Sequence, residues 1–347
     1  MIQSVKIINF TGFKESEIHF SKGLNLLIGE NGAGKSNLLR LLYSVTSVSA
    51  DEGKKKPNTI PTKNSFQPLI AQKLLSVFRP ESLGRLVKRK QGREKCEIDF
   101  KYLHSSCDIK FSFSSNSRNE VEIEKLPTET IQKQPVFFPT RELLSIYPGF
   151  VSLYELYHLE FEETWRDTCL LLGAPLTKGP REKKIQTFLQ PLEEAMGGNL
   201  VLEPNGRFYL SLPGKGKLEI PLTAEGIRKI AMLSRLIASG SLLEQGCLFW
   251  DEPESNLNPK YIKLVAKIIF DLASHGLQVF AATHSLFFLK EIEILSRMSK
   301  IQSSRYIGLS EKNEEFLIEQ GNDIADLSLI TVLEEDLMQS DRFMEMR

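Results

Sequence analysis

The sequence predicts an α/β fold with a mostly parallel core sheet, an antiparallel β subdomain and a helical insertion. Three observations lead to this prediction. Apolar runs alternate with amphipathic stretches at both ends of the chain, as in "GLNLLIG" before "SNLLRLLYSV" and "GCLFWDEP" before "PKYIKLVAKIIF". Runs of period two fill residues 96–126, and helical spacing dominates residues 150–196. Alternating strands and helices indicate a parallel sheet, whereas consecutive period-two runs indicate an antiparallel meander.

The expected elements follow from these patterns in chain order. Strands are expected at 4–10, 16–20, 23–29, 96–103, 107–115, 120–126, 135–139, 199–212, 217–222, 246–251 and 278–283. Helices are expected at 36–45, 68–78, 151–173, 181–196, 225–239, 259–276 and over the acidic C-terminal stretch. Residues 51–66 are polar and contain proline, so they are expected to form a loop.

The composition is that of a globular chain of balanced charge. Its 347 residues include 44 basic and 44 acidic side chains, so the chain as a whole is not a polycation and contact with DNA would need a local patch. No apolar run reaches the roughly 20 residues of a membrane helix, and the first residues lack the layout of a secretory signal. The sequence therefore favours a cytoplasmic protein without a membrane partner.

The four cysteines are widely spaced and form no C-x-x-C pair. Such spacing argues against a disulfide framework and against a zinc site. They are expected to be reduced packing residues at positions Cys96, Cys107, Cys169 and Cys247.

A glycine-rich loop follows the strand expected at 23–29. Residues 29–36, "GENGAGKS", fit G-x-x-x-x-G-K-[ST] without a gap. Backbone N–H groups of such a loop converge on phosphate oxygens, the lysine reaches the β- and γ-phosphates, and the serine hydroxyl binds Mg²⁺. The alternative is a glycine turn that fits by chance, which the strand–loop–helix context disfavours. The predicted ATP-binding residues are Asn31, Gly32, Ala33, Gly34, Lys35, Ser36 and Asn37.

Two adjacent carboxylates end the apolar run "CLFW". Asp251 would hold Mg²⁺ together with Ser36, and Glu252 would act as general base toward the attacking water. Two carboxylates at the end of a buried strand are costly unless a cation or hydrogen bonds satisfy them. The alternative is an ordinary strand end with a solvated acidic pair.

A histidine ends the next apolar run, "QVFAATHS". His284 lies about 30 residues beyond the carboxylates and could hydrogen-bond the γ-phosphate. A single histidine is more often structural than catalytic, but its place one strand after an acidic pair favours a catalytic role.

These three motifs, in this order, resemble those of ABC-type ATPases, and within them the SMC/RecF/OLD group. The resemblance rests on "VKIINFTGFKESEIHFSKGLNLLIGENGAGKSNLL" and on "LFWDEPESNLNP" followed by "FAATHS". It covers both ends of the chain well and the middle weakly. Transporter motors more often carry Thr where Asn37 stands, and more than 200 residues separate the loop from Asp251, which excludes compact small GTPases.

The resemblance implies one ABC-type ATPase head over residues 1–347. Its P-loop core would combine residues 1–50 and 198–347. Residues 51–149 would form a basic loop and helix with the antiparallel β segment, and residues 150–197 would form the helical insertion. ATP and Mg²⁺ are the implied ligands, and ATP hydrolysis is the implied reaction.

The resemblance also implies a homodimer with two ATP sites, in which each subunit supplies a signature segment to its partner's nucleotide. Here the signature is a degenerate match, Thr223, Ala224, Glu225 and Gly226. The D-loop at the same interface would be Ser255, Asn256, Leu257 and Asn258. The position of the family's glutamine loop is taken by "FFPTRELL", which offers Thr140, Arg141 and Glu142 but no glutamine.

What the chain lacks also narrows its relatives. It contains no long heptad run like the coiled coils of SMC proteins, and no D-x-D follows His284 as in the nuclease domain of OLD proteins. A head of this kind is expected to work with a separately encoded effector, a nuclease or a toxin, in DNA repair or defence against phage.

Two alternatives remain for its function. One is a regulatory scaffold that turns over ATP slowly and holds a toxic effector inactive, which Ala224 and the missing glutamine favour. The other is a transporter motor, which the N-terminal pattern disfavours. Contact with DNA would involve Lys54–Lys56 or the basic run from Arg85 to Lys95, although such runs are also typical of solvated faces.

Overall fold

The central layer of the molecule is a six-stranded sheet, sheet B, with the strand order β14-β13-β3-β12-β11-β7. The computed structural model describes residues 1–55, 60–88, 92–157, 159–177, 182–243, 246–299, 304–328 and 331–345. The strands of sheet B are β3 (Leu24–Gly29), β7 (Val136–Phe138), β11 (Gly246–Asp251), β12 (Leu277–Thr283), β13 (Ser304–Lys312) and β14 (Glu315–Gly321). All neighbours are parallel except the hairpin β13–β14. The predicted mostly parallel core sheet is confirmed.

A second sheet, sheet A, is antiparallel and has the order β2-β1-β4-β5-β6. Its strands are β1 (Ile2–Phe10), β2 (Phe13–His19), β4 (Lys95–Tyr102), β5 (Ile109–Ser114) and β6 (Glu122–Lys125). A third sheet is a small antiparallel meander of β8 (Asn199–Leu202), β9 (Phe208–Leu212) and β10 (Gly216–Glu219). The predicted antiparallel subdomain is therefore present. The N-terminal strands β1 and β2 belong to it, and β1 pairs with β4.

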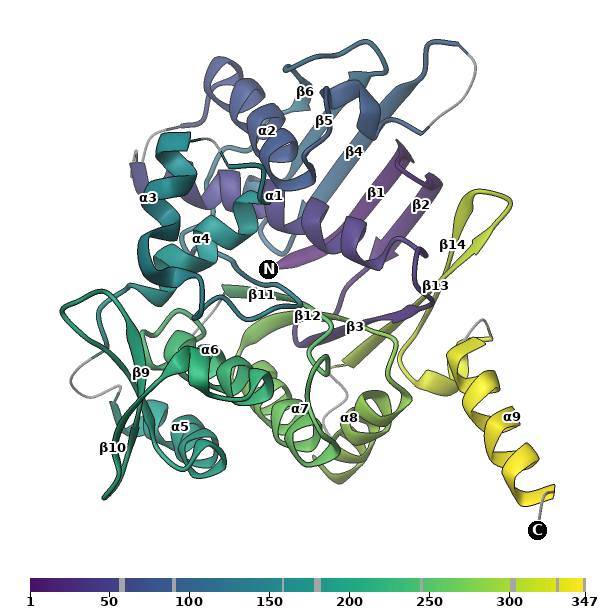
Figure 1. Ribbon diagram of the computed structural model, residues 1–347. Coiled ribbons are helices and arrows are strands. Elements are labelled where there is room, and N and C mark those ends of the chain that lie inside the picture. The colour runs from purple at the N-terminus through teal and green to yellow at the C-terminus, as the bar shows by residue number, and fades with distance from the viewer. Residues whose placement is uncertain are drawn as a thin grey trace.

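Helices cover both faces of sheet B, and the described residues also include helices away from it. The helices are α1 (Lys35–Lys55), α2 (Lys63–Phe78), α3 (Tyr147–Tyr157), α4 (Glu163–Leu172), α5 (Glu182–Met196), α6 (Glu225–Ala238), α7 (Pro259–Ser274), α8 (Leu286–Ser299) and α9 (Thr331–Glu345). Figure 1 shows α1 between the two larger sheets with α2 beside it, α6, α7 and α8 on the opposite face of sheet B, and α9 extending from the body near the C-terminus. No helix in the described ranges is both long and apolar enough to cross a membrane.

Two hydrophobic cores lie on the two faces of sheet B. Leu27 packs with α1, α2 and the inner face of sheet A, while Leu26 and Ile28 pack with α6, α7 and α8. Alternate residues of one strand thus enter different cores, as the period of two requires. Because both faces are covered, β3 and β12 are buried along their whole length, which explains their continuous apolar sequence.

The prediction of a loop at residues 51–66 is wrong for most of those residues that the structure describes. Helix α1 continues to Lys55, and α2 begins at Lys63 with Thr62 as its N-cap. Residues 56–59 lie outside the described residues. The extra helical turn is stabilised by tertiary packing, because a Cβ at Gly53 would lie 2.6 Å from the Thr130 side chain. Such packing outweighs the low helix propensity of the segment.

The strands also cross the sequence ranges expected for the three parts of the head. Strands β1 and β2, within 1–50, pair into sheet A, whereas β7, within 51–149, joins sheet B. The expected helical insertion at 150–197 contains α4, α5 and most of α3. The division of the head into separate parts stays a prediction.

Candidate functional site

Four strands of sheet B end at one edge of the sheet, and the predicted motifs follow them. In the ladder, Ile28 is paired with Thr283, Ala282 with Asp251, and Trp250 with Phe138. The glycine loop, the acidic pair, His284 and the segment after Phe138 therefore start from the same edge. Ligands of open parallel sheets bind at the carboxyl ends of the strands.

The glycine loop has glycine where the surrounding structure leaves no room for a side chain. A Cβ at Gly29 would lie 2.0 Å from the carbonyl oxygen of Leu309 on β13. Gly34 has a φ of +91°, and a Cβ there would lie 2.5 Å from the ring of Phe316 on β14. The hairpin β13–β14 thus supports the loop from outside, and only glycine fits at these two positions.

Lys35 is buried in the first turn of α1 and holds the loop in shape. Its ammonium donates hydrogen bonds to the carbonyl oxygens of Gly29 and Glu30, both at 2.7 Å. Burial lowers the pKa of Lys35, and the carboxylates of Asp251 and Glu252 oppose that shift. A buried ammonium beside a ring of backbone N–H groups can bind phosphate oxygens.

Asp251 lies beside Ser36 at the start of the same helix. Burial raises the pKa of Asp251, while the hydrogen bond with the Ser36 hydroxyl and the charge of Arg40 lower it. One carboxylate and one hydroxyl suit Mg²⁺, which is commonly held by one or two carboxylates together with substrate phosphates. No group of three His, Cys, Asp or Glu side chains in the described ranges could hold a metal ion by itself. The residues present therefore fit Mg²⁺ that arrives with a nucleotide.

Glu252 and His284 face each other across the ends of β11 and β12. The Nδ1 atom of His284 lies 3.2 Å from Oε1 of Glu252, and both side chains are partly exposed. Glu252 has a φ of +51°, which is uncommon for a residue with a side chain and is a mark of functional sites. The pair can bind and orient a water molecule, which is the geometry that a general base needs.

Glu254 is a buried carboxylate that sequence reasoning missed. Its Oε1 accepts hydrogen bonds from the Thr283 hydroxyl at 2.6 Å and from the backbone N–H of His284 at 3.4 Å. Its Oε2 is buried and has no hydrogen-bond partner in the described part of the chain. Burial raises the pKa of Glu254. In the sequence, the third acidic residue of "DEPE" was the signal that could have indicated Glu254. In the structure, Glu254 anchors the turn that carries His284.

Arg40 and Glu162 form a second missed pair at the site. Arg40 is four residues after Ser36 on α1 and is hydrogen-bonded to Glu162, which precedes α4. Burial raises the pKa of Glu162, and the negative charge of Asp251 raises it further. The segment before α4 therefore reaches the part of the site where Ser36 and Asp251 lie. The spacing of Ser36 and Arg40 on one helix face could have indicated Arg40 but not its partner.

The signature segment leads into α6. Thr223 is nearly buried and donates its hydroxyl to the carbonyl oxygen of Ile220 at 2.8 Å. Ala224 is the N-cap of α6 and provides no side-chain cap. The N–H groups of the first turn consequently lack the usual Ser or Asp partner, and an anion could take that place.

The D-loop segment packs against the signature segment of the same chain. Asn256 donates a hydrogen bond to Glu225 at 2.9 Å, and a Cβ at Gly226 would lie 2.9 Å from the carbonyl oxygen of Asn256. Asn258 is the N-cap of α7, where its side chain accepts from Tyr261 N–H at 3.1 Å. Leu257 is half-buried against the core. The predicted segments are thus brought together, and Asn258 has a structural role.

The segment after β7 occupies the place expected for the glutamine loop. The carbonyl oxygen of Thr140 accepts a hydrogen bond from the Ser255 hydroxyl at 3.1 Å. Glu142 is bound by Arg228 at 2.7 Å and by Ser145 at 2.6 Å, so its carboxylate is engaged with α6. Arg141 is exposed, and the described residues offer it no hydrogen bond or ion pair. Of the three predicted residues, Glu142 is held within the chain through its carboxylate, whereas the Arg141 side chain is exposed.

Comparison with known protein families decides the family. A model of an AAA ATPase domain matches residues 1–144, and a model described as "AAA domain, putative AbiEii toxin, Type IV TA system" matches residues 87–290, more than half of the chain. The chain belongs to this AAA domain family. Together with the relatives below, the matches show an ABC-type ATPase head of the SMC/RecF group.

Similar proteins support this assignment at different lengths. An ATP/GTP phosphatase of Helicobacter pylori is 20% identical over 92% of this chain and 94% of its own. The DNA replication and repair protein RecF of Clostridium kluyveri is 43% identical, but over only 12% of each chain. A crystal structure of an Smc head bound to the C-terminal winged-helix domain of ScpA matches 92% of this ATPase head and 97% of that chain, with a TM-score of 0.54 and 14% identity. The structural likeness shows the fold alone.

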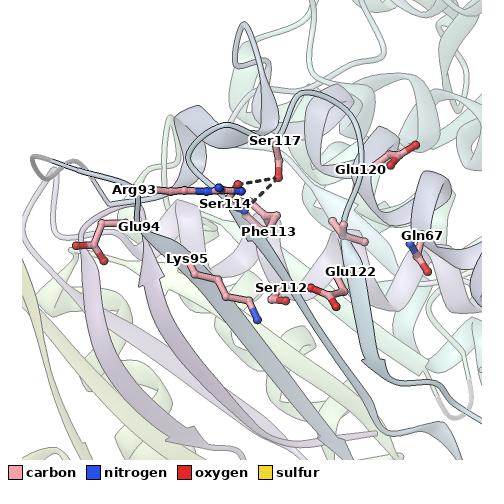
Figure 2. Close-up of a pocket in the computed structure, with 11 residues that line it drawn as sticks. Gln67, Arg93, Glu94, Lys95, Ser112, Phe113, Ser114, Ser117, Glu120 and Glu122 are labelled. Atoms are coloured by element: carbon pink, nitrogen blue, oxygen red, sulfur yellow. Dashed lines mark hydrogen bonds between the residues drawn. The ribbon is translucent and has the colours of Figure 1, made fainter.

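One hollow in the described part of the ATPase head lies away from these motifs. Figure 2 shows this pocket of about 580 Å³ beside β4, β5 and β6, with Arg93, Lys95 and Glu122 among its lining residues. The basic run that borders it is mostly engaged within the chain: Arg85 pairs with Glu81, Lys88 with the carbonyl oxygen of Glu314, and Lys95 with Glu124. Residues 89–91 lie outside the described residues. The described part of this run is therefore a charged surface with internal partners.

Proposed function

We propose that this ATPase head binds ATP with Mg²⁺, dimerises on it, and hydrolyses it to reset the dimer, and that this cycle controls a separate effector. The observation that carries the proposal is the convergence of Lys35, Asp251, Glu252 and His284 at one edge of sheet B. These four side chains come from both ends of the chain, 249 residues apart at most. Families of this kind use such an edge for nucleotide chemistry.

Each residue has one part in the reaction. Bound ATP with Mg²⁺ supplies the bond that is cleaved. The N–H groups from Asn31 to Ser36 and the ammonium of Lys35 hold the phosphates, and Ser36 and Asp251 hold the metal. Glu252 accepts a proton from the attacking water, and His284 fixes the Glu252 carboxylate and donates toward the γ-phosphate.

The dimer part of the proposal rests on the signature side of the molecule. Leu222, directly before the signature segment, is 70% exposed. The first turn of α6 carries uncapped N–H groups beside it. An apolar residue next to an anion-binding helix end suits contact with the nucleotide and loop of a second copy.

Replacement of Glu252 by Gln tests the whole cycle. The variant keeps the phosphate loop and the metal ligands, so it should bind ATP, turn over about 10²- to 10⁴-fold more slowly, and accumulate as an ATP-bound dimer. Light scattering after size-exclusion chromatography, with ATP and with ADP, measures the association. If the variant binds ATP but stays monomeric with ATP as it does with ADP, the proposed dimer is contradicted. Unchanged turnover would contradict the role of Glu252.

A second function, a slow regulatory ATP-binding protein that holds a toxic effector inactive, has two observations in its favour. Ala224 gives the signature helix no side-chain cap, and Glu142, in the segment where a glutamine is expected, is engaged with Arg228. The family description also names a toxin of a toxin–antitoxin system. Steady-state ATPase rates with and without DNA separate the two functions, because the regulatory protein should remain slow in both conditions.

The proposed location is the cytoplasm. The proposed reaction uses ATP and Mg²⁺, which that compartment supplies. All four cysteines are unpaired, as expected in a reducing compartment. The DNA contact and the identity of the effector belong to the same proposal, since several similar proteins are named for DNA repair.

A further inference from the structure

A buried lysine of α6 reaches the catalytic edge of sheet B. Lys229 is 2% exposed, on the second turn of the helix that begins at the signature segment. Its ammonium donates to the carbonyl oxygen of Glu252 at 2.7 Å, to the hydroxyl of Ser255 at 2.6 Å and to the carbonyl oxygen of Ser255 at 3.1 Å. A buried ammonium has three N–H groups, and each has an acceptor here.

The backbone of Glu252 is held in an unusual conformation between two hydrogen bonds. Its N–H donates to the carbonyl oxygen of Ala282 on β12 at 2.9 Å, and its carbonyl oxygen accepts from Lys229. The φ of +51° at Glu252 is strained for a residue with a side chain, so it persists only where such bonds hold it. The direction of the Glu252 carboxylate therefore depends on both bonds.

The same bonds join three segments of the site. The Ser255 hydroxyl, which accepts from Lys229, donates in turn to the carbonyl oxygen of Thr140 at the end of β7. One turn before Lys229, Glu225 accepts from Asn256. Helix α6 is thus bound at two successive turns to the segment that runs from Glu252 to Asn256. A displacement of α6 would be transmitted to Glu252 through these bonds rather than lost in a loop.

We propose that Lys229 is a positioning residue, which ties the direction of the general base Glu252 to the position of the signature helix of its own chain. The inference rests on the proposed function, because it takes Glu252 as the base. In the proposed dimer, the N-terminus of α6 faces the nucleotide of the second copy. Occupancy of one ATP site would then set the geometry of the base in the other.

The main alternative is that Lys229 only stabilises the fold, and α6 offers a matched control. Arg235 lies on the same helix, is also nearly buried at 6% exposure, and also donates to backbone carbonyl oxygens, those of Leu172 and Ala174. The contacts that the described residues give Arg235 are with Leu172, Ala174 and the ring of Phe208, away from the carboxyl edge of sheet B. Loss of Arg235 reports the cost of removing a buried, carbonyl-bound cation from α6, without any effect on Glu252.

The test compares Lys229→Met, Lys229→Arg and Arg235→Met with the wild type. Turnover and ATP affinity are measured separately, and hydrogen exchange of the peptide covering 251–257 is followed without nucleotide. For Lys229→Met we expect turnover about 10- to 100-fold lower, ATP affinity within about twofold, and faster exchange of that peptide. Lys229→Arg should recover part of the turnover, and Arg235→Met should change neither turnover nor exchange at 251–257.

Two results would overturn the proposal: turnover within about threefold of wild type in folded Lys229→Met, or an equal loss in Arg235→Met. If Lys229→Met does not fold, Lys229→Arg is the deciding variant. Wild-type turnover and wild-type hydrogen exchange at 251–257 in Lys229→Arg would contradict a need for the contact geometry of the Lys229 ammonium. The double variant with Glu252→Gln should show no further loss of turnover. If Glu252→Gln alone keeps full turnover, the proposed role of Glu252 fails, while the exchange measurement still tests the bond from Lys229.

Discussion

Two charged regions of this molecule use the same residue types with opposite energetics. On the outer face of sheet A, hydrogen bonds from Lys110 lower the pKa of Glu124 to about 2, and Glu124 raises the pKa of Lys110. At the carboxyl edge of sheet B, burial raises the pKa of Asp251 and lowers the pKa of Lys229 to about 8. Charged forms are favoured by pairing in the first region and disfavoured by burial in the second.

The difference separates charges that serve the fold from charges that serve a ligand. Exposed pairs such as Lys110 with Glu124 keep their water and add little stability. Asp251 and Glu254 are buried without equivalent partners, which costs stability in the free protein. Clusters of buried groups with shifted pKa values are typical of functional sites, where a ligand supplies the missing partner. Three substitutions test this comparison.

The largest effect is expected for Lys35→Ala, with Lys110→Ala as the matched control on sheet A. Removal of the Lys35 ammonium should lower the affinity for ATP about 10- to 100-fold, because a charge-assisted bond to phosphate is lost. Lys110→Ala should leave the affinity unchanged. Calorimetric titration measures both. Equal ATP affinity in Lys35→Ala and the wild type would contradict the phosphate loop assignment.

A smaller effect, a gain in the stability of the nucleotide-free protein, is expected for Asp251→Asn. Because the folded state raises the pKa of Asp251, its stabilising contribution is present below the ordinary pKa and is lost as pH rises through the folded value. At pH 7 the amide should therefore raise the free energy of unfolding by about 1 kcal/mol while turnover with Mg²⁺ is lost.

Denaturant unfolding of the nucleotide-free protein at pH 7 measures the effect of Asp251→Asn on stability. The wild type should recover the difference when ATP and Mg²⁺ are added, because the ligand charges then offset the carboxylate. A lower stability of Asp251→Asn in the absence of nucleotide would mean that the Ser36 and Arg40 contacts outweigh burial, and the contrast between the two regions would fail at this residue.

The smallest effect is expected for Glu124→Gln on sheet A. The pKa of Glu124 is lowered to about 2, so the stability that its carboxylate contributes is present above the ordinary pKa and is lost as pH falls through about 2. The pair is exposed, so the loss at pH 7 should be about 0.5 kcal/mol and should shrink in salt. Unfolding at pH 7 in low and high salt measures it. A change in turnover would mean that this face takes part in the reaction.

The sequence predicted the elements whose periodicity reflects burial. Strands β3, β11 and β12 are buried on both faces, so their apolar runs end where the chain leaves the sheet, at Gly29, Asp251 and Thr283. That the motif residues lie together follows from the parallel arrangement of these strands. The helix over residues 51–55 was missed because packing of Gly53 against Thr130, distant in sequence, stabilises it.

The missed site residues share one physical cause. Lys229 and Glu162 look like ordinary solvated charges in the sequence, since lysine and glutamate are mostly exposed. Their burial depends on partners that are distant in sequence: Glu252 lies 23 residues from Lys229, and Arg40 lies 122 residues from Glu162. No local pattern records such a partner. The support of the glycine loop by Leu309 and Phe316 is of the same kind, because only pairing of β13 with β3 brings them there.

The sequence by itself determined the chemistry at each strand end: a glycine loop with Lys35 and Ser36, the carboxylates Asp251 and Glu252, and His284. Loop geometry, charge and strand periodicity are local properties, so they can be read from neighbouring residues. The tertiary structure decided which distant groups are buried beside them, such as Lys229 on the Glu252 carbonyl and Arg40 with Glu162. Those contacts set the pKa shifts and the backbone of the proposed base, because burial and pairing depend on the packing of helices and sheets that the chain joins only when folded.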